Sequence, residues 1–301
     1  MIVAEQLTKI YGEQKALDAV SFTVNPGDIL GFLGPNGAGK STVMKILTCY
    51  LPQSSGMATV CGLDVNEDAM EIKKLVGYLP EHNPLYTDMY VKEYLDFIAE
   101  MHKLKNRKAR VDEMVEITGL TEEYRKKIGQ LSKGYRQRVG LAQAMIHSPE
   151  VLILDEPTSG LDPNQISDIR QLIRKIGSEK TVILSTHIMQ EVEAVCDRVI
   201  IISKGKIVAD DETSVLLKGP SSEITVTVEF DQPVSGELLL KINGVTGTEK
   251  ISEKKWKLRC SSGADPRAGI FNFAVANNMT VLGMQKEEQK LEEVFRQLTS
   301  G

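Results

Sequence analysis

One segment near the N-terminus constrains this chain more than any other, because a glycine-rich loop follows the unbroken apolar run Ile29–Leu33. The loop fits the pattern GxxxxGK[ST], and its residues are Gly34, Pro35, Asn36, Gly37, Ala38, Gly39, Lys40, Ser41 and Thr42. Glycines let backbone N–H groups wrap around a phosphate, the lysine adds positive charge, and the serine hydroxyl suits Mg²⁺. Helical spacing after Lys40 would direct a positive helix end at the same anion. The sequence therefore predicts a buried strand, a phosphate-binding loop and a helix.

The chain beyond this loop alternates between strand and helix patterns. Apolar runs at residues 151–154 and 181–185 are typical of buried strands, and helical spacing over residues 164–176 separates them. Such alternation predicts an α/β fold with a largely parallel sheet.

A long helical segment interrupts this alternation. Apolar residues recur at helical spacing between Tyr90 and about Ala144. Tyr94, Phe97, Ile98 and Met101 would share one face of an expected helix. We therefore expect a helical subdomain, at about residues 85–145, inserted in the α/β core.

The residue pattern of the sequence changes near residue 218. Residues 218–222 contain Gly, Pro and Ser and are typical of a linker. We therefore expect a first domain over residues 1–217. A second, small α+β domain would occupy residues 222–301 and end in an amphipathic helix at residues 291–298. A brace between two copies is the interpretation we favour for this second domain, and a ligand sensor is the alternative.

Two acidic residues end one of the apolar strands. Asp155 and Glu156 follow directly on residues 151–154. A strand buried on both faces has little reason to end in adjacent acids unless its tip meets a cation or a water. An isolated Asp-Glu pair is more often the start of a solvated loop, but the phosphate loop favours the catalytic interpretation here. His187 lies just past another strand, where it could donate a hydrogen bond to a phosphate.

These motifs occur in the order typical of one family. Residues 131–135 read Leu-Ser-Lys-Gly-Tyr ahead of the acidic strand, and Asp162 closes Ser-Gly-Leu-Asp just after Glu156. An aromatic residue, Tyr11, precedes the loop. Over roughly residues 1–215 the chain resembles the ATP-binding cassette (ABC) family, whose signature segment reads LSGGQ.

The resemblance implies an ATPase core in which two copies, or two similar subunits, enclose two ATP molecules. Tyr11 would stack on adenine, and Lys40 would contact the terminal phosphates. Glu156 would be the general base, with His187 as a switch residue. Ser41, Glu81 and Asp155 would bind Mg²⁺. Ser132, Lys133 and Gly134 would contact the ATP of the second subunit, and Asp162 would lie in the dimer interface.

Three positions depart from the family pattern. Lys133 and Tyr135 replace Gly and Gln of the signature, and Glu81 stands where the family usually carries a Gln that reaches Mg²⁺. Lys133 could add charge near the phosphates or point to solvent, and we favour the second. It would be strained if the backbone there needed a positive φ. A carboxylate also suits Mg²⁺, so we expect Glu81 to preserve function.

The resemblance implies a role in transport through partners. No window has the roughly 18 apolar residues of a membrane helix, so we expect a cytoplasmic subunit held at the membrane by permease subunits. Residues 83–94 would receive a permease helix, although Tyr86, Tyr90 and Tyr94 could equally be ordinary packing. Single-cassette export-type subunits resemble the chain most, and the gliding-motility-associated type is nearest.

Other functions are less consistent with the sequence. A net charge of −5 gives no support for a nucleic-acid binder. A soluble cassette ATPase of ribosome or DNA-repair type would usually carry a second cassette or a coiled-coil insertion. A regulator that binds ATP without turnover is disfavoured because Lys40 and Glu156 are both present.

Overall fold

A computed structural model of the chain describes residues 1–218, 223–261, 266–287 and 295. Two compact units emerge from it. Met1–Thr213 form the first, and the described residues from Ser214 onward form the second. The expected linker falls mainly on residues 219–222, which lie outside the described residues.

A six-stranded sheet forms the centre of the first unit. Its order is β10 (Lys206–Glu212), β9 (Arg198–Ser203), β3 (Ile29–Leu33), β8 (Thr181–Thr186), β7 (Val151–Asp155) and β6 (Val76–Leu79). The strands from β9 to β6 are parallel, whereas β10 is antiparallel to β9. All residues of β3, β7 and β8 are buried, which explains their unbroken apolar runs. The predicted parallel α/β core is confirmed.

A smaller antiparallel sheet lies in the same unit. Its order is β2 (Gln14–Val24), β1 (Ile2–Tyr11), β4 (Ser55–Val60) and β5 (Leu63–Asp64). Helix α1 (Lys40–Leu47) contributes Val43, Met44 and Ile46 to one hydrophobic cluster that contains residues of both sheets. The helix that begins at the glycine loop is therefore fixed by packing on both sheets.

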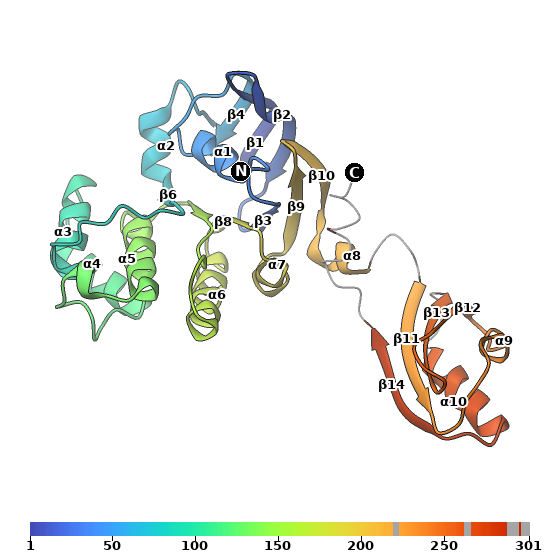
Figure 1. Cartoon of the computed structure of the whole chain (residues 1–301). Coiled ribbons are helices and arrows are strands. Elements are labelled where there is room, and N and C mark those ends of the chain that lie inside the picture. The colour runs from blue at the N-terminus through green and yellow to red at the C-terminus, as the bar shows by residue number, and fades with distance from the viewer. Residues whose placement is uncertain (219–222, 262–265, 288–294, 296–301) are drawn as a thin grey trace. The chain divides into compact units, whose positions relative to one another are not determined.

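The remaining helices of this unit fall into two groups. Those of the α/β core are α2 (Ala69–Leu75), α6 (Pro163–Gly177) and α7 (Met189–Val195). Helix α8 (Thr213–Lys218) begins at the last residue of this unit, and the rest of it belongs to the second unit. The inserted helical segment contains α3 (Val91–Met101), α4 (Arg107–Ile117), a 3₁₀ turn at Ile128–Gln130 and α5 (Lys133–Met145). These helices lie together beyond β6 (Figure 1).

Helix α3 buries only part of the apolar face that its spacing indicated. The helix buries Val91, Tyr94, Leu95 and Ala99. Phe97 and Met101 are 38% and 64% exposed. Both faces carry apolar residues at helical spacing, so periodicity alone could not tell which one packs. Phe97 is therefore an exposed aromatic residue on the surface of this helix.

The second unit is a four-stranded antiparallel sheet with helices. Its elements are β11 (Glu223–Phe230), α9 (Gly236–Leu239), β12 (Val245–Lys250), β13 (Lys255–Ser261), α10 (Pro266–Ala276) and β14 (Val281–Glu287), and the strand order is β12-β13-β11-β14. Val228, Phe230, Leu258 and Ile270 lie in its core. The amphipathic helix expected at residues 291–298 lies outside the described residues, apart from Phe295.

Candidate active site

The glycine loop connects the end of β3 to α1. An added Cβ at Gly34 would collide with the carbonyl oxygen of Ile202, and Gly39 has a φ of +112°, a value that disfavours other residues. Lys40 is buried, and its Nζ donates hydrogen bonds to the carbonyl oxygens of Gly34 at 2.8 Å and Pro35 at 3.3 Å. The ammonium group is therefore held inside the curve of the loop, where an anion would meet it.

Two carboxylates meet this loop from the end of β7. Asp155 is buried and accepts hydrogen bonds from Ser185 Oγ and from Ser41 Oγ, the latter at 3.0 Å. Glu156 has a φ of +49°, and its backbone N–H donates to the carbonyl oxygen of Ser185 at 3.1 Å. The left-handed backbone turns the second carboxylate away from the direction of the first.

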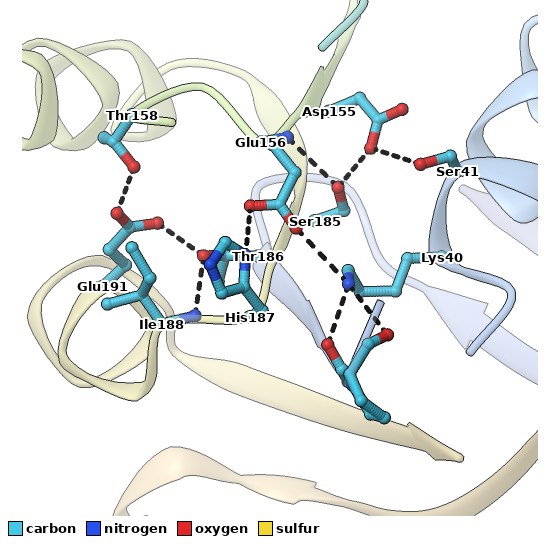
Figure 2. Close-up of polar contacts among 12 residues, drawn as sticks. Lys40, Ser41, Asp155, Glu156, Thr158, Ser185, Thr186, His187, Ile188 and Glu191 are labelled. Carbon is cyan, nitrogen blue, oxygen red and sulfur yellow. Dashed lines mark hydrogen bonds and ion pairs between the residues drawn. The ribbon is translucent and has the colours of Figure 1, made fainter. Parts of the chain in front are cut away.

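Glu156 lies between two groups that carry or can carry positive charge. Its Oε1 is 3.3 Å from Lys40 Nζ, and its Oε2 is 2.9 Å from Nδ1 of His187 (Figure 2). Because β3, β8 and β7 are parallel neighbours, their carboxyl ends carry the loop, the histidine and the acids to one edge of the sheet. A buried carboxylate fixed on both oxygens is suited to hold a water and accept its proton.

Part of the predicted site, including the glycine loop from Asn36, Lys40, Glu156 and His187, surrounds one cavity of about 330 Å³. Asp155 does not line it but is hydrogen-bonded to Ser41, which does. Its lining residues are Ala16, Asn36, Gly37, Gly39, Lys40, Ser41, Thr42, Glu81, Glu156, Ser159 and His187. Tyr11 is exposed at the end of β1 and is not part of this lining. A larger hollow of about 710 Å³ is lined only by residues of the helical segment, among them Tyr90 and Tyr124. It contains neither the glycine loop nor Asp155 and Glu156.

The oxygen donors of the cavity fit a magnesium ion. Ser41 Oγ and Asp155 Oδ1 are adjacent, and Glu81 lines the same cavity. Hard oxygen ligands suit Mg²⁺, which usually takes only one or two protein carboxylates and completes its shell with phosphates and water. In the described part of the chain no three His, Cys, Asp or Glu side chains form a metal cluster.

Comparison with known proteins identifies the family. A model described as ABC transporter matches residues 17–159. The linearmycin resistance ATP-binding protein LnrL of Bacillus subtilis (strain 168) is 33% identical, with 99% of this chain and 98% of the relative covered. The chain belongs to the ATP-binding subunits of ABC transporters. It is an ATPase that uses ATP and Mg²⁺.

Two further similarities support the assignment of this chain to the ABC family. The bacitracin transport ATP-binding protein BcrA of Bacillus licheniformis is 33% identical over 100% of this chain and 98% of its own length. A dimeric post-hydrolysis structure of the ATP-binding cassette MJ0796, bound to ADP and Pi, superposes with a TM-score of 0.65 at 25% identity. That superposition covers 70% of this chain and 98% of the cassette.

The signature segment of the ABC subunit begins a helix. Ser132 is the N-cap of α5, and its Oγ accepts a hydrogen bond from the backbone N–H of Tyr135 at 3.3 Å. Lys133 is exposed and is the first residue of that helix, so its backbone is not strained. Its ammonium group lies against Gly160 of the same chain. Ser132, Lys133 and Gly134 do not line the nucleotide cavity, and Asp162 is the N-cap of α6.

A second set of polar residues was missed by sequence reasoning. Ser185 donates a hydrogen bond to Asp155, while Glu191 accepts hydrogen bonds from Thr158 and Thr186. Tyr78 lies close enough that the charges of Asp155 and Glu81 add to burial in raising its pKa. Polar residues at the end of an apolar strand could have pointed to Ser185 and Thr186. Glu191 gives no such signal, because only the fold brings it to Thr158.

In the described residues, no helix is both long and apolar enough to cross a lipid bilayer.

Proposed function

We propose that this ABC subunit works in the cytoplasm, where two copies, or one copy and a similar subunit, close on two ATP molecules beneath separate permease subunits. Hydrolysis would then reopen the pair and reset the permease. The observation that carries the proposal is the position of Glu156 in one cavity with the glycine loop, Lys40 and His187.

The glycine loop and the charged residues of the cavity each have a role in this mechanism. The loop and Lys40 bind the terminal phosphates, and Glu156 takes a proton from the attacking water. His187 orients Glu156 and donates a hydrogen bond to the γ-phosphate. Mg²⁺, when bound, neutralises phosphate charge, and Ser41 and Asp155 hold it with Glu81 in support.

The remaining predicted residues act at the edges of the site. Tyr11 is exposed, which leaves its ring available for an adenine base to stack on. Ser132 and Gly134, with Lys133 beside them, would contact the ATP of the second subunit through the start of α5. Asp162 would lie in the interface between the subunits. These contacts require the second subunit, because the three signature residues lie outside this chain's own cavity.

An exposed aromatic cluster supports docking on a permease. Tyr86 is 56% exposed, and its ring lies 5.8 Å from Tyr94 and 6.0 Å from Phe97 between centroids. Tyr86, Phe97 and Met101 form an exposed apolar surface on the helical segment, whereas Tyr94 is buried. Such a surface suits an amphipathic helix from a partner. Replacing Tyr86 and Phe97 by Ser should abolish co-purification with a multi-span membrane protein, whereas Lys40→Ala should not.

The transporter is proposed to be of export type. The relatives named above carry the words linearmycin resistance and bacitracin transport, and a third relative is a daunorubicin resistance ATP-binding protein, 34% identical over 81% of this chain. Resistance to a toxic compound is consistent with its removal from the cell. The motifs also resemble those of gliding-motility-associated subunits. On that resemblance, the complex that this subunit drives by ATP hydrolysis would be of the gliding-motility-associated type.

The experiment that tests the proposal separates nucleotide binding from pairing. With ATP and Mg²⁺, the wild-type protein should dimerise and release phosphate. Lys40→Ala should lose ATP binding, whereas Ser132→Phe should bind ATP as a monomer but neither dimerise nor turn over. Size-exclusion chromatography with light scattering and a phosphate-release assay make these measurements. Normal dimerisation and turnover of Ser132→Phe would contradict the composite site.

A further inference from the structure

A buried carboxylate outside the nucleotide cavity joins two segments of the site. Glu191 lies on α7 and is 2% exposed. One carboxylate oxygen accepts a hydrogen bond from Thr158 Oγ1, and the other accepts one from Thr186 Oγ1 at 2.6 Å (Figure 2). The same Thr186 oxygen accepts a hydrogen bond from the backbone N–H of Ile188 at 3.0 Å. We call this arrangement the Thr158–Glu191–Thr186 bridge.

The bridge connects the two parts of the chain on which turnover depends. Thr158 follows Glu156 by two residues and directly precedes residues 159–162. Thr186 and Ile188 flank His187 on either side. A carboxylate held away from water is costly unless its hydrogen bonds are made, so the three side chains favour one joint arrangement.

We propose that Glu191 is a positioning residue that couples residues 159–162 to His187. The inference rests on the proposed function, in which residues 159–162 face the second subunit. When that subunit docks, a shift of Ser159 carries Thr158 with it, and the bridge passes the shift to Thr186 and so to His187. The histidine then reaches its working position only when the second subunit is present.

The chemistry of glutamate suits this role. Its two oxygens accept from two hydroxyl groups at once, and Thr186 Oγ1 already accepts from Ile188, so its proton is directed at Glu191. Glutamine offers one acceptor and one donor group, and therefore keeps only part of the bridge. Alanine removes the bridge altogether. Neither Thr158 nor Glu191 lines the nucleotide cavity, so a change at either should alter kcat more than KM.

The first test is a double-mutant cycle in the full-length protein. We expect Glu191→Ala and Thr158→Val each to lower kcat by roughly ten- to a hundredfold, as small misplacements near a reacting centre do, with an unchanged KM for ATP. The double variant should be no worse than Glu191→Ala. Glu191→Gln should recover part of the loss, and Glu193→Gln, an exposed position on the same helix, should match wild type. Additive losses, or a fall in melting temperature with normal kcat, would overturn the coupling.

The second test reads the bridge without catalysis. Hydrogen exchange of the Ile188 amide reports how firmly Thr186 is held. In the absence of ATP, Thr158→Val should accelerate this exchange by at least about tenfold, because hydrogen bonds through Glu191 and Thr186 link Thr158 to the Ile188 amide. Unchanged protection in Thr158→Val would overturn the inference even if Glu191→Ala failed to fold.

The two proposals fail in distinguishable ways. If wild-type protein hydrolyses ATP in a Glu156-dependent manner but exchange at Ile188 ignores Thr158, only the coupling is wrong. If wild-type protein neither dimerises nor releases phosphate, the proposed function is wrong, and the coupling has lost its basis.

Discussion

In the described part of the chain, every buried side chain that carries a charge, a side-chain amide or an alcohol group lies between Lys40 and Thr213, in the first unit. The second unit buries Val226, Val228, Phe230 and Leu258, and the most polar groups it encloses are the indole of Trp256 and the thiol of Cys260. Both units have close-packed apolar cores. Only one of them keeps costly polar groups inside.

The difference shows where the fold sacrifices stability for chemistry. A buried lysine or carboxylate costs free energy that a hydrocarbon side chain would not. Lys40 at the start of α1 pairs with Glu156, and Asp155 ends the buried strand β7; the cost of burying these groups is offset by hydrogen bonds and by that ion pair. The described core of the second unit contains nothing comparable and is built for packing. Four experiments test this contrast.

The largest effect is expected for Glu156→Gln. The amide keeps the shape of the side chain but cannot accept a proton from water, and positioned general bases typically contribute about 10²- to 10⁴-fold to rate. We expect phosphate release to fall by that amount while ATP binding persists. The matched control is Glu229→Gln on β11 of the second unit, which should leave turnover unchanged. Equal losses in both variants would break the contrast.

Site residues could be predicted from the sequence where local pattern identifies them, but not where they depend on contacts between residues far apart in the chain. Ile29–Leu33 was predicted with its observed bounds, because an apolar run ends there at glycine. The glycine loop, Asp155 and Glu156 were found from local pattern, and His187 from its place after a strand. The Thr158–Glu191–Thr186 bridge could not be predicted from the sequence, because Thr158 and Glu191 lie 33 residues apart and meet only after β8 and α7 have packed.

The second largest effect concerns the apolar core of the second unit. Phe230 is fully buried, and Phe→Ala in such positions costs about 3–5 kcal/mol. We expect Phe230→Ala to unfold the second unit at lower temperature while the first unit still binds ATP. Calorimetry together with nucleotide titration makes the measurement. Phe32→Ala, two residues before the glycine loop and also in a buried strand, is the matched change and should weaken ATP binding as well. Loss of ATP binding in Phe230→Ala would mean that the units are not independent.

A smaller effect should appear as an acid sensitivity of the first unit. Burial is the main cause that lowers the pKa of His147 to about 4, aided by His102, which stacks on it, and by Arg110 and Lys180. Because the unfolded chain binds this proton near pH 6.5, the folded state loses stability as pH falls from about 6.5 toward 4. We expect about 1 kcal/mol from this partly buried ring, after allowance for solvent screening.

The variant His147→Phe isolates that effect. It should flatten the pH dependence of urea unfolding between pH 7.5 and pH 5 for the first unit. The sequence has no histidine after His187, so unfolding of the second unit should respond equally to pH in wild type and variant. An identical slope for the first unit in both proteins would assign the acid sensitivity to other groups.

The smallest effect is expected where the charge of the first unit is exposed rather than buried. Lys133 replaces the signature glycine, but its side chain lies against Gly160 of its own chain and outside the nucleotide cavity. An exposed ammonium is screened by water and salt, so we expect Lys133→Ala to change turnover by less than about threefold, like the control Lys127→Ala. A loss of tenfold or more for Lys133→Ala alone, shrinking as salt is raised, would indicate that this ammonium reaches the triphosphate of the second subunit. An exposed charge of the first unit would then contribute to turnover together with its buried charges.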